Sequence, residues 1–115
     1  MTEFPSVADR LAHISSAIDA VREILLGISD DALTQDEVRQ LALERLFEII
    51  CIASSYVPTN LKADENGTKW EAIDAVGRRL ENTRDRIEPH VLWTMSQDVF
   101  IPLKAWAERH QRELG

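Results

Sequence analysis

The densest group of side chains capable of chemistry in this chain is a set of arginines near residue 80. The segment 70–93 contains four of them, Arg78, Arg79, Arg84 and Arg86. A guanidinium group offers a planar fork of N–H donors that can grip a phosphate group. Acidic residues are interleaved with the arginines, and a spacing such as that of Arg78 and Glu81 also suits an ion pair on an exposed helix face. Composition alone favours the ion-paired surface and leaves phosphate binding as the alternative.

The other candidate groups are three histidines and one cysteine. His13, His90 and His110 fall on three different expected helices, and none has a second ligand three or four residues away. A zinc site needs three or four converging ligands, so we expect no metal site. Cys51 lies in an apolar stretch without an adjacent base, which indicates a small core residue rather than a nucleophile. The sequence has no glycine-rich phosphate loop and no nucleophile elbow, so no cofactor is expected.

Length and charge limit the classes of protein to which this chain could belong. Its 115 residues predict a single domain, 1–115, with one hydrophobic core. The net charge of −7 argues against a broad affinity for nucleic acid, because phosphate binding depends on gathered cationic groups. No basic-then-apolar leader opens the chain, and no apolar run approaches the roughly 18 residues of a membrane span. These observations, with the single cysteine, predict a cytoplasmic protein that does not enter a membrane.

Two helices are expected in the first half of the chain. Residues 1–5 form a short arm, and Ser6 can cap a helix whose apolar residues recur at alternating steps of four and three. Gly27 predicts the end of this helix. The second helix should begin at a capping box, Thr34–Glu37, and end just before Pro58. From Leu46 onward its apolar residues cover nearly the whole circumference, which predicts that one of its faces lies at a subunit interface.

The second half predicts one charged helix and one interrupted helix. Residues 58–67 form a polar loop. A second capping box, Thr68–Glu71, begins the third helix, which should carry the arginines as far as Pro89. Pro89 suits the first position of a fourth helix, and Pro102 should kink or split that helix. No segment alternates with period two, so the expected fold is an all-α, up-down bundle of four to five helices.

Four segments of the chain share their spacing with one known family. They are Arg10–Ile18, Leu43–Ile50, the stretch from Trp70 to Trp93, and Val99–Leu103. Together they resemble the opening helix, the central helix, the surroundings of the active site and the kinked last helix of the HepT-like family of HEPN-domain proteins. The resemblance covers about residues 7–108. It implies a HEPN-like helical fold and a homodimer.

The resemblance also implies an activity and a partner. HepT-like proteins act as the toxin half of toxin–antitoxin pairs, typically with a minimal nucleotidyltransferase antitoxin (MntA-like). Their ribonuclease site is an Arg, four to six residues, then a His, often with a Tyr two residues further on, and it faces the same groups across the dimer cleft. The Arg would hold the scissile phosphate, and the His would exchange a proton with the RNA. The antitoxin can modify the Tyr with adenylate groups.

These family roles fall on residues of other types in this chain. When positions are counted from the two flanking tryptophans, the Arg falls on Gly77, the His on Asn82 and the Tyr on Arg84. Asparagine cannot exchange a proton as histidine does, and Arg84 has no phenol to accept an adenylate. An acidic residue of the central helix is missing too, since Cys51-Ile52-Ala53 stands where Gly-Glu-Ala is common in the family. The resemblance therefore implies a degenerate catalytic centre.

Three hypotheses follow from the sequence. The first is a HepT-like toxin-family protein that keeps the fold, the dimer and the antitoxin partner but has reduced or no ribonuclease activity. Its residual binding of RNA or a nucleotide would use Arg78, Arg79, Asn82 and Arg84. The second is an active endoribonuclease that uses Arg84 and His90, which fit the pattern of Arg, five residues, His, although Pro89 lies between them. The third is a non-catalytic helical module that binds a second copy or another partner.

Overall fold

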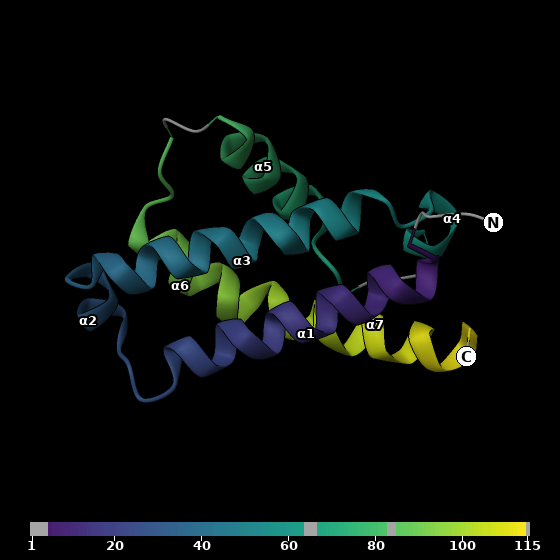
Figure 1. Ribbon diagram of the computed structural model, residues 1–115, viewed down its shortest axis with the longest axis horizontal. Coiled ribbons are helices and arrows are strands. Elements are labelled where there is room, and N and C mark those ends of the chain that lie inside the picture. The colour runs from purple at the N-terminus through teal and green to yellow at the C-terminus, as the bar shows by residue number, and fades with distance from the viewer. Residues whose placement is uncertain (1–4, 64–66, 83–84, 115) are drawn as a thin grey trace.

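The computed structural model describes residues 5–63, 67–82 and 85–114, and every regular element within them is a helix (Figure 1). The helices are α1 (Val7–Leu25), α2 (Asp30–Thr34), α3 (Glu37–Ser55), α4 (Thr59–Lys62), α5 (Trp70–Glu81), α6 (Pro89–Asp98) and α7 (Phe100–Leu114). The two shortest, α2 and α4, have five and four residues. The prediction of an all-α fold is confirmed, with five longer helices. The two short helices were not expected, and α4 lies in the stretch predicted to be a loop.

The longer helices alternate in direction along the molecule (Figure 1). α1 begins and α7 ends at the same end of the molecule, α3 runs back toward that end, and α5 runs away from it again. α1 packs on α3 and α7, and α3 in turn packs on α5. This is the up-down arrangement that the sequence predicted. None of the described helices combines the length and the apolar character needed to cross a membrane.

Aromatic side chains join the helices in the core. Phe47 of α3 and Phe100 of α7 are fully buried and meet edge to face, with ring centroids 4.6 Å apart. Trp70, the first residue of α5, meets Trp106 of α7 in the same way at 4.8 Å. Such aromatic pairs contribute about 0.5–1.5 kcal/mol beyond the area they bury. Trp70 therefore anchors the first turn of α5 to the body of the bundle.

Helix caps decide where α1 and α3 begin. Ser6 caps α1 as predicted, because its hydroxyl accepts a hydrogen bond from the Asp9 N–H and the Asp9 carboxylate accepts one from the Ser6 N–H, both at 3.1 Å. The predicted cap at Thr34 was wrong, since Thr34 is the last residue of α2. Asp36 caps α3 instead, and its Oδ1 accepts from the Arg39 N–H at 3.1 Å. Both candidates have a side-chain oxygen at the right spacing, and the formation of α2 decided between them.

The second predicted capping box and the length of the third helix were also wrong. Lys69 is the N-cap of α5, and no side chain caps that helix. The hydroxyl of Thr68 is buried without a hydrogen-bond partner among the described residues. α5 ends at Glu81 instead of continuing toward Pro89, and residues 85–88 are not helical. Arg78 and Arg79 therefore lie on α5, whereas Arg86 lies on the non-helical connection to α6.

Two helix boundaries agree with the sequence. Gly27, just beyond α1, has a φ of 76°, which is a backbone conformation that favours glycine. The last predicted helix is split as expected, with α6 ending at Asp98 and α7 beginning at Phe100. Pro102 is the third residue of α7, where its missing N–H removes no helical hydrogen bond. The break therefore lies a few residues before the proline that causes it.

Candidate functional site

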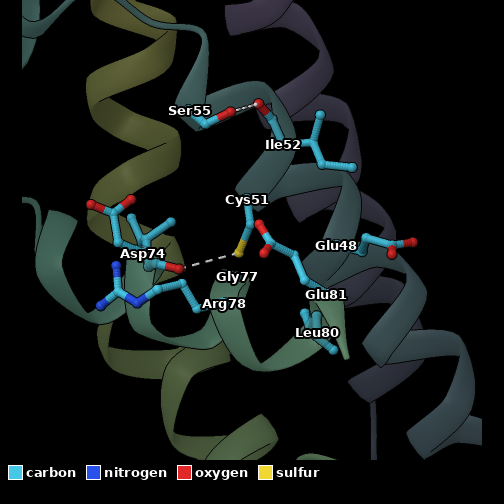
Figure 2. A pocket seen from close by; sticks show the side chains of 10 residues that line it. Glu48, Cys51, Ile52, Ser55, Asp74, Gly77, Arg78, Leu80 and Glu81 are labelled. Atoms are coloured by element: carbon cyan, nitrogen blue, oxygen red, sulfur yellow. Dashed lines mark hydrogen bonds between the residues drawn. The ribbon is translucent and has the colours of Figure 1, made fainter. Parts of the chain in front are cut away.

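α3 and α5 enclose a pocket of about 190 Å³ (Figure 2). Its apolar lining includes Cys51 and Ile52 from α3 and Ile73 and Leu80 from α5. Its charged lining consists of Glu48, Asp74, Arg78 and Glu81. Three of the candidate residues named from the sequence line this pocket, namely Cys51, Gly77 and Arg78. The structure thus brings part of the predicted site to one place, against the middle of α3.

Gly77 of α5 packs directly against Cys51 of α3. A Cβ atom added at Gly77 would lie 3.1 Å from the Cβ of Cys51 and 3.6 Å from its Sγ. Contacts of 3.1 Å between two such carbons are tighter than normal packing distances of about 3.5–4.0 Å. The Cβ of Cys51 cannot rotate away, because its position is fixed by the backbone of α3. A Cβ at position 77 would therefore require the two helices to shift by a few tenths of an ångström.

Cys51 is a packing residue in this contact, as the sequence predicted. It is buried, and its thiol donates to the Ile73 carbonyl oxygen at 3.4 Å. Burial, followed by the nearby carboxylates of Asp74 and Glu48, raises the pKa of the Cys51 thiol to about 12. The thiolate is the nucleophilic form of cysteine, and this pKa keeps it scarce at neutral pH. The site has no activated sulfur nucleophile.

The rim of the pocket is predominantly acidic. Glu48, Asp74 and Glu81 supply three carboxylates, whereas Arg78 supplies the single cationic group of the lining. The predicted ion pair of Arg78 with Glu81 was wrong, because Arg78 makes no ion pair with any residue that the structure describes. Three carboxylates against one guanidinium disfavour a phosphate group in this pocket.

Two other arginines are held by carboxylates at the connection between α5 and α6. Arg79 donates to both carboxylate oxygens of Glu88, at 2.9 and 3.3 Å, and to the carbonyl oxygen of Arg86 at 2.7 Å. The Arg79 guanidinium holds the pKa of the Glu88 carboxyl below its usual range. Arg86 reaches both carboxylate oxygens of Glu44 on α3 at 3.0 Å. These forks already bind carboxylates, so the ion-paired interpretation is confirmed for Arg79 and Arg86.

The remaining positions predicted to bind phosphate lie at and beyond the end of α5. Asn82 is the C-cap of α5, with φ −90° and ψ 107°, and its backbone N–H donates to the Arg79 carbonyl oxygen. The helix that Arg78 and Asn82 were expected to share therefore ends at this cap. Arg84 lies outside the described residues.

Comparison with known protein families identifies the group to which these features belong. A family model described as ribonuclease HepT-like matches residues 14–109 of the chain. The chain belongs to the HepT-like family. No curated protein and no solved structure matches it. The resemblance predicted from the four segments is confirmed at the level of the family, and the assignment of catalytic positions within it stays a prediction.

The histidines of this HepT-like protein occupy unrelated places. His90, the second residue of α6, is exposed, and its Nδ1 lies 2.7 Å from the Asp30 carboxylate on α2. His110 is buried against Trp106, with the two ring centroids 4.5 Å apart. His13 is exposed on α1. The described residues contain no group of three or more side chains able to hold a metal ion.

Sequence reasoning missed the acidic partners in this HepT-like site. Glu44 and Glu48 belong to the helix predicted to be apolar all round, yet one holds Arg86 and the other lines the pocket. Asp30, the first residue of α2, contacts His90. Spacing within one helix could have indicated that Glu44 and Glu48 share a face. It could not have indicated which later segment lies opposite them.

Proposed function

We propose that this HepT-like protein is the toxin-family member of a cytoplasmic toxin–antitoxin pair that keeps the fold, a homodimer and a nucleotidyltransferase antitoxin partner but does not cleave RNA. The observation that carries this proposal is the contact of Gly77 with Cys51 at an added-Cβ distance of 3.1 Å. If the family arginine falls on position 77, α3 and α5 must shift by a few tenths of an ångström to admit even its Cβ. Asn82 at the next family position cannot act as an acid or base.

A ribonuclease assay tests this proposal directly. Purified wild-type protein and a His90→Ala variant should both leave a mixed RNA substrate intact, at the rate of a protein-free control. Copurification with a nucleotidyltransferase encoded beside the gene tests the partnership. Cleavage by the wild type that survives repurification would overturn the proposed loss of activity.

Residual RNA binding is expected to be weak and local. Arg79 is bound by Glu88, so among the described positions of the predicted set Arg78 is the guanidinium that a phosphate would meet first. Binding through one arginine neutralises about one phosphate, so the affinity should fall only gently with salt, with a log–log slope of about −0.7 to −0.9. Fluorescence anisotropy at low salt should show weak binding that Arg78→Ala removes. Arg22→Ala on α1 is the matched control, because it removes the same charge from an exposed position.

An active nuclease is the second candidate, and one contact favours it. The 2.7 Å approach of His90 Nδ1 to Asp30 leaves Nε2 of an exposed histidine directed to solvent. A carboxylate behind an imidazole orients the ring for proton exchange, as in other acid–base sites. If this candidate is correct, His90→Ala abolishes cleavage and Asp30→Asn reduces it, whereas His13→Ala leaves it unchanged. The third candidate is a non-catalytic binding module. It is supported by the acidic rim of the pocket, which disfavours the phosphate groups of RNA.

A further inference from the structure

The face of α3 that points away from the core carries exposed apolar side chains. Their exposed fractions are 78% for Val38, 48% for Leu41, 46% for Ile52 and 62% for Tyr56. α1 lies on one flank of α3 and α5 on the other, so this face is left between them (Figure 1). These side chains form two apolar groups, Val38 with Leu41 and Ile52 with Tyr56, and exposed apolar groups on one helix face are a candidate interaction surface.

The spacing along this face is that of a helix pair. Leu41, Arg45, Glu48 and Ile52 follow one another at steps of four, three and four. These are the steps of the a and d positions of a heptad, which form the seam between two packed helices. Arg45 and Glu48 are exposed at the middle of the seam and form an ion pair within the chain. The apolar residues stand on either side of this charged centre.

The same face is complementary to itself when one copy is reversed. A two-fold axis that passes between residues 46 and 47 of two antiparallel copies places Leu41 of one copy opposite Ile52 of the other. It also places Arg45 of one copy opposite Glu48 of the other. Every pair made in this way is either apolar with apolar or cation with anion. A two-fold symmetric interface requires a surface patch that matches itself in this sense. Two copies placed in parallel would instead put Arg45 beside Arg45.

We propose that α3 packs antiparallel against α3 of a second copy, about a two-fold axis between residues 46 and 47, with Arg45 of each copy paired to Glu48 of the other. This inference rests on the homodimer of the proposed function and names the surface that forms it. Glu48 also lines the α3–α5 pocket. In the dimer, the guanidinium beside Glu48 on the rim of each pocket therefore comes from the other copy, in place of the Arg45 of the same chain.

Charge reversal by mixing tests this pairing. Arg45→Glu and Glu48→Arg each place like charges in both symmetric contacts, so each variant alone should dissociate at a concentration at least about tenfold higher than the wild type. An equimolar mixture of the two variants restores both pairs in a heterodimer, and its dissociation should return close to that of the wild type. The ion pair within one chain cannot produce this rescue, because each variant still carries like charges within itself. Sedimentation equilibrium of the wild type, of each variant and of the mixture measures the dissociation of the dimer.

Disulfide trapping fixes the register independently. In a Cys51→Ala background, Leu41→Cys combined with Ile52→Cys should give a covalent dimer on mild oxidation. Leu41→Cys alone should not, because the two copies of residue 41 lie about 16 Å apart along the helices at a rise of about 1.5 Å per residue, whereas a disulfide spans at most about 7 Å between Cα atoms. Circular dichroism of each variant checks that the fold is kept.

The results of these experiments distinguish the α3 pairing from the homodimer on which it rests. A wild-type dimer that the charge variants do not weaken, or a mixture that shows no rescue, overturns the α3 pairing and leaves the proposed dimer on another face. A wild type that is monomeric at every concentration tested overturns both the dimer and the pairing. Neither result bears on the loss of ribonuclease activity, which the RNA assay measures.

Discussion

Replacing Gly77 by alanine tests whether the contact between α3 and α5 excludes a side chain. In an unconstrained helix interior this change stabilises by about 0.5–1 kcal/mol, because glycine is the poorer helix former. Here the added Cβ would lie 3.1 Å from the Cβ of Cys51. Overpacking of this kind costs about 1–3 kcal/mol when the neighbour cannot move away. We therefore expect Gly77→Ala to lower the free energy of unfolding by about 1 kcal/mol, against the trend of helix propensity.

A double-mutant cycle with Cys51→Gly isolates the steric cause. Removing the Cβ of Cys51 removes the obstacle, so Gly77→Ala in that background should stabilise by about 0.5–1 kcal/mol. The coupling between the two positions would then be near 2 kcal/mol, which is at the upper part of the range for residues in contact. Urea unfolding followed by circular dichroism gives the midpoint and the slope for all four proteins.

A control on the same helix calibrates the propensity term. Ala75 is exposed on α5, so Ala75→Gly should cost about 1 kcal/mol without any packing effect. If Gly77→Ala stabilises the wild type by as much as the control predicts, the two helices yield to a Cβ at no cost. The packing of α3 on α5 would then accept a Cβ at position 77, and the proposed exclusion of the family arginine would be wrong.

Three further predictions concern single groups. The Cys51 thiol, buried and with a pKa raised to about 12, should react with iodoacetamide at pH 8 far more slowly in the native protein than in urea, as mass spectrometry would show. Ser6→Ala removes the α1 cap and should lower the free energy of unfolding by about 1 kcal/mol, with Ser16→Ala, an exposed position within α1, as the control in the same urea titration. Glu88 has a folded-state pKa below its ordinary 4.5, chiefly through its hydrogen bond with Arg79, so its contribution to stability is present above about pH 4.5 and is lost as the pH falls below that value. Thermal unfolding of Glu88→Gln should accordingly approach that of the wild type at low pH, and a constant difference across the pH range would contradict the reasoning.

Helix boundaries were predicted correctly where a single capping residue or proline determines them. Ser6 precedes an unambiguous apolar stripe, and Pro89 and Pro102 restrict the backbone by their own chemistry, so the ends of α1, α6 and α7 followed. The predicted cap at Thr34 was wrong because Thr34 belongs to the short helix α2, and α3 begins two residues later at Asp36. α2 packs on α6, far along the chain. Local spacing contains no information about that contact.

The candidate site could be predicted only in part, for a related reason. Arg86 and its partner Glu44 are separated by 42 residues, and they meet because the connection between α5 and α6 crosses α3. The sequence showed that arginines and acids were present in similar numbers near residue 80, but the pairing was set by tertiary structure. The same applies to Gly77, whose role depends on Cys51 lying opposite it.

The arginines of α5 and its connection are thus poor evidence for a retained nuclease. Arg79 holds Glu88 with both arms of its guanidinium fork, and the Nε–H of Arg86 is shared between the two carboxylate oxygens of Glu44, so the two arginines tie residues 86–88 to α5 and α3. A structural use of these side chains accounts for them without any RNA. The exposed apolar face of α3 is covered only in part within one chain, since the Arg10 guanidinium lies 4.1 Å from the centroid of the Tyr56 ring while Val38, Leu41 and Ile52 stay exposed. Selection for a partner surface, rather than for catalysis, is therefore the simpler account of what this HepT-like protein has kept.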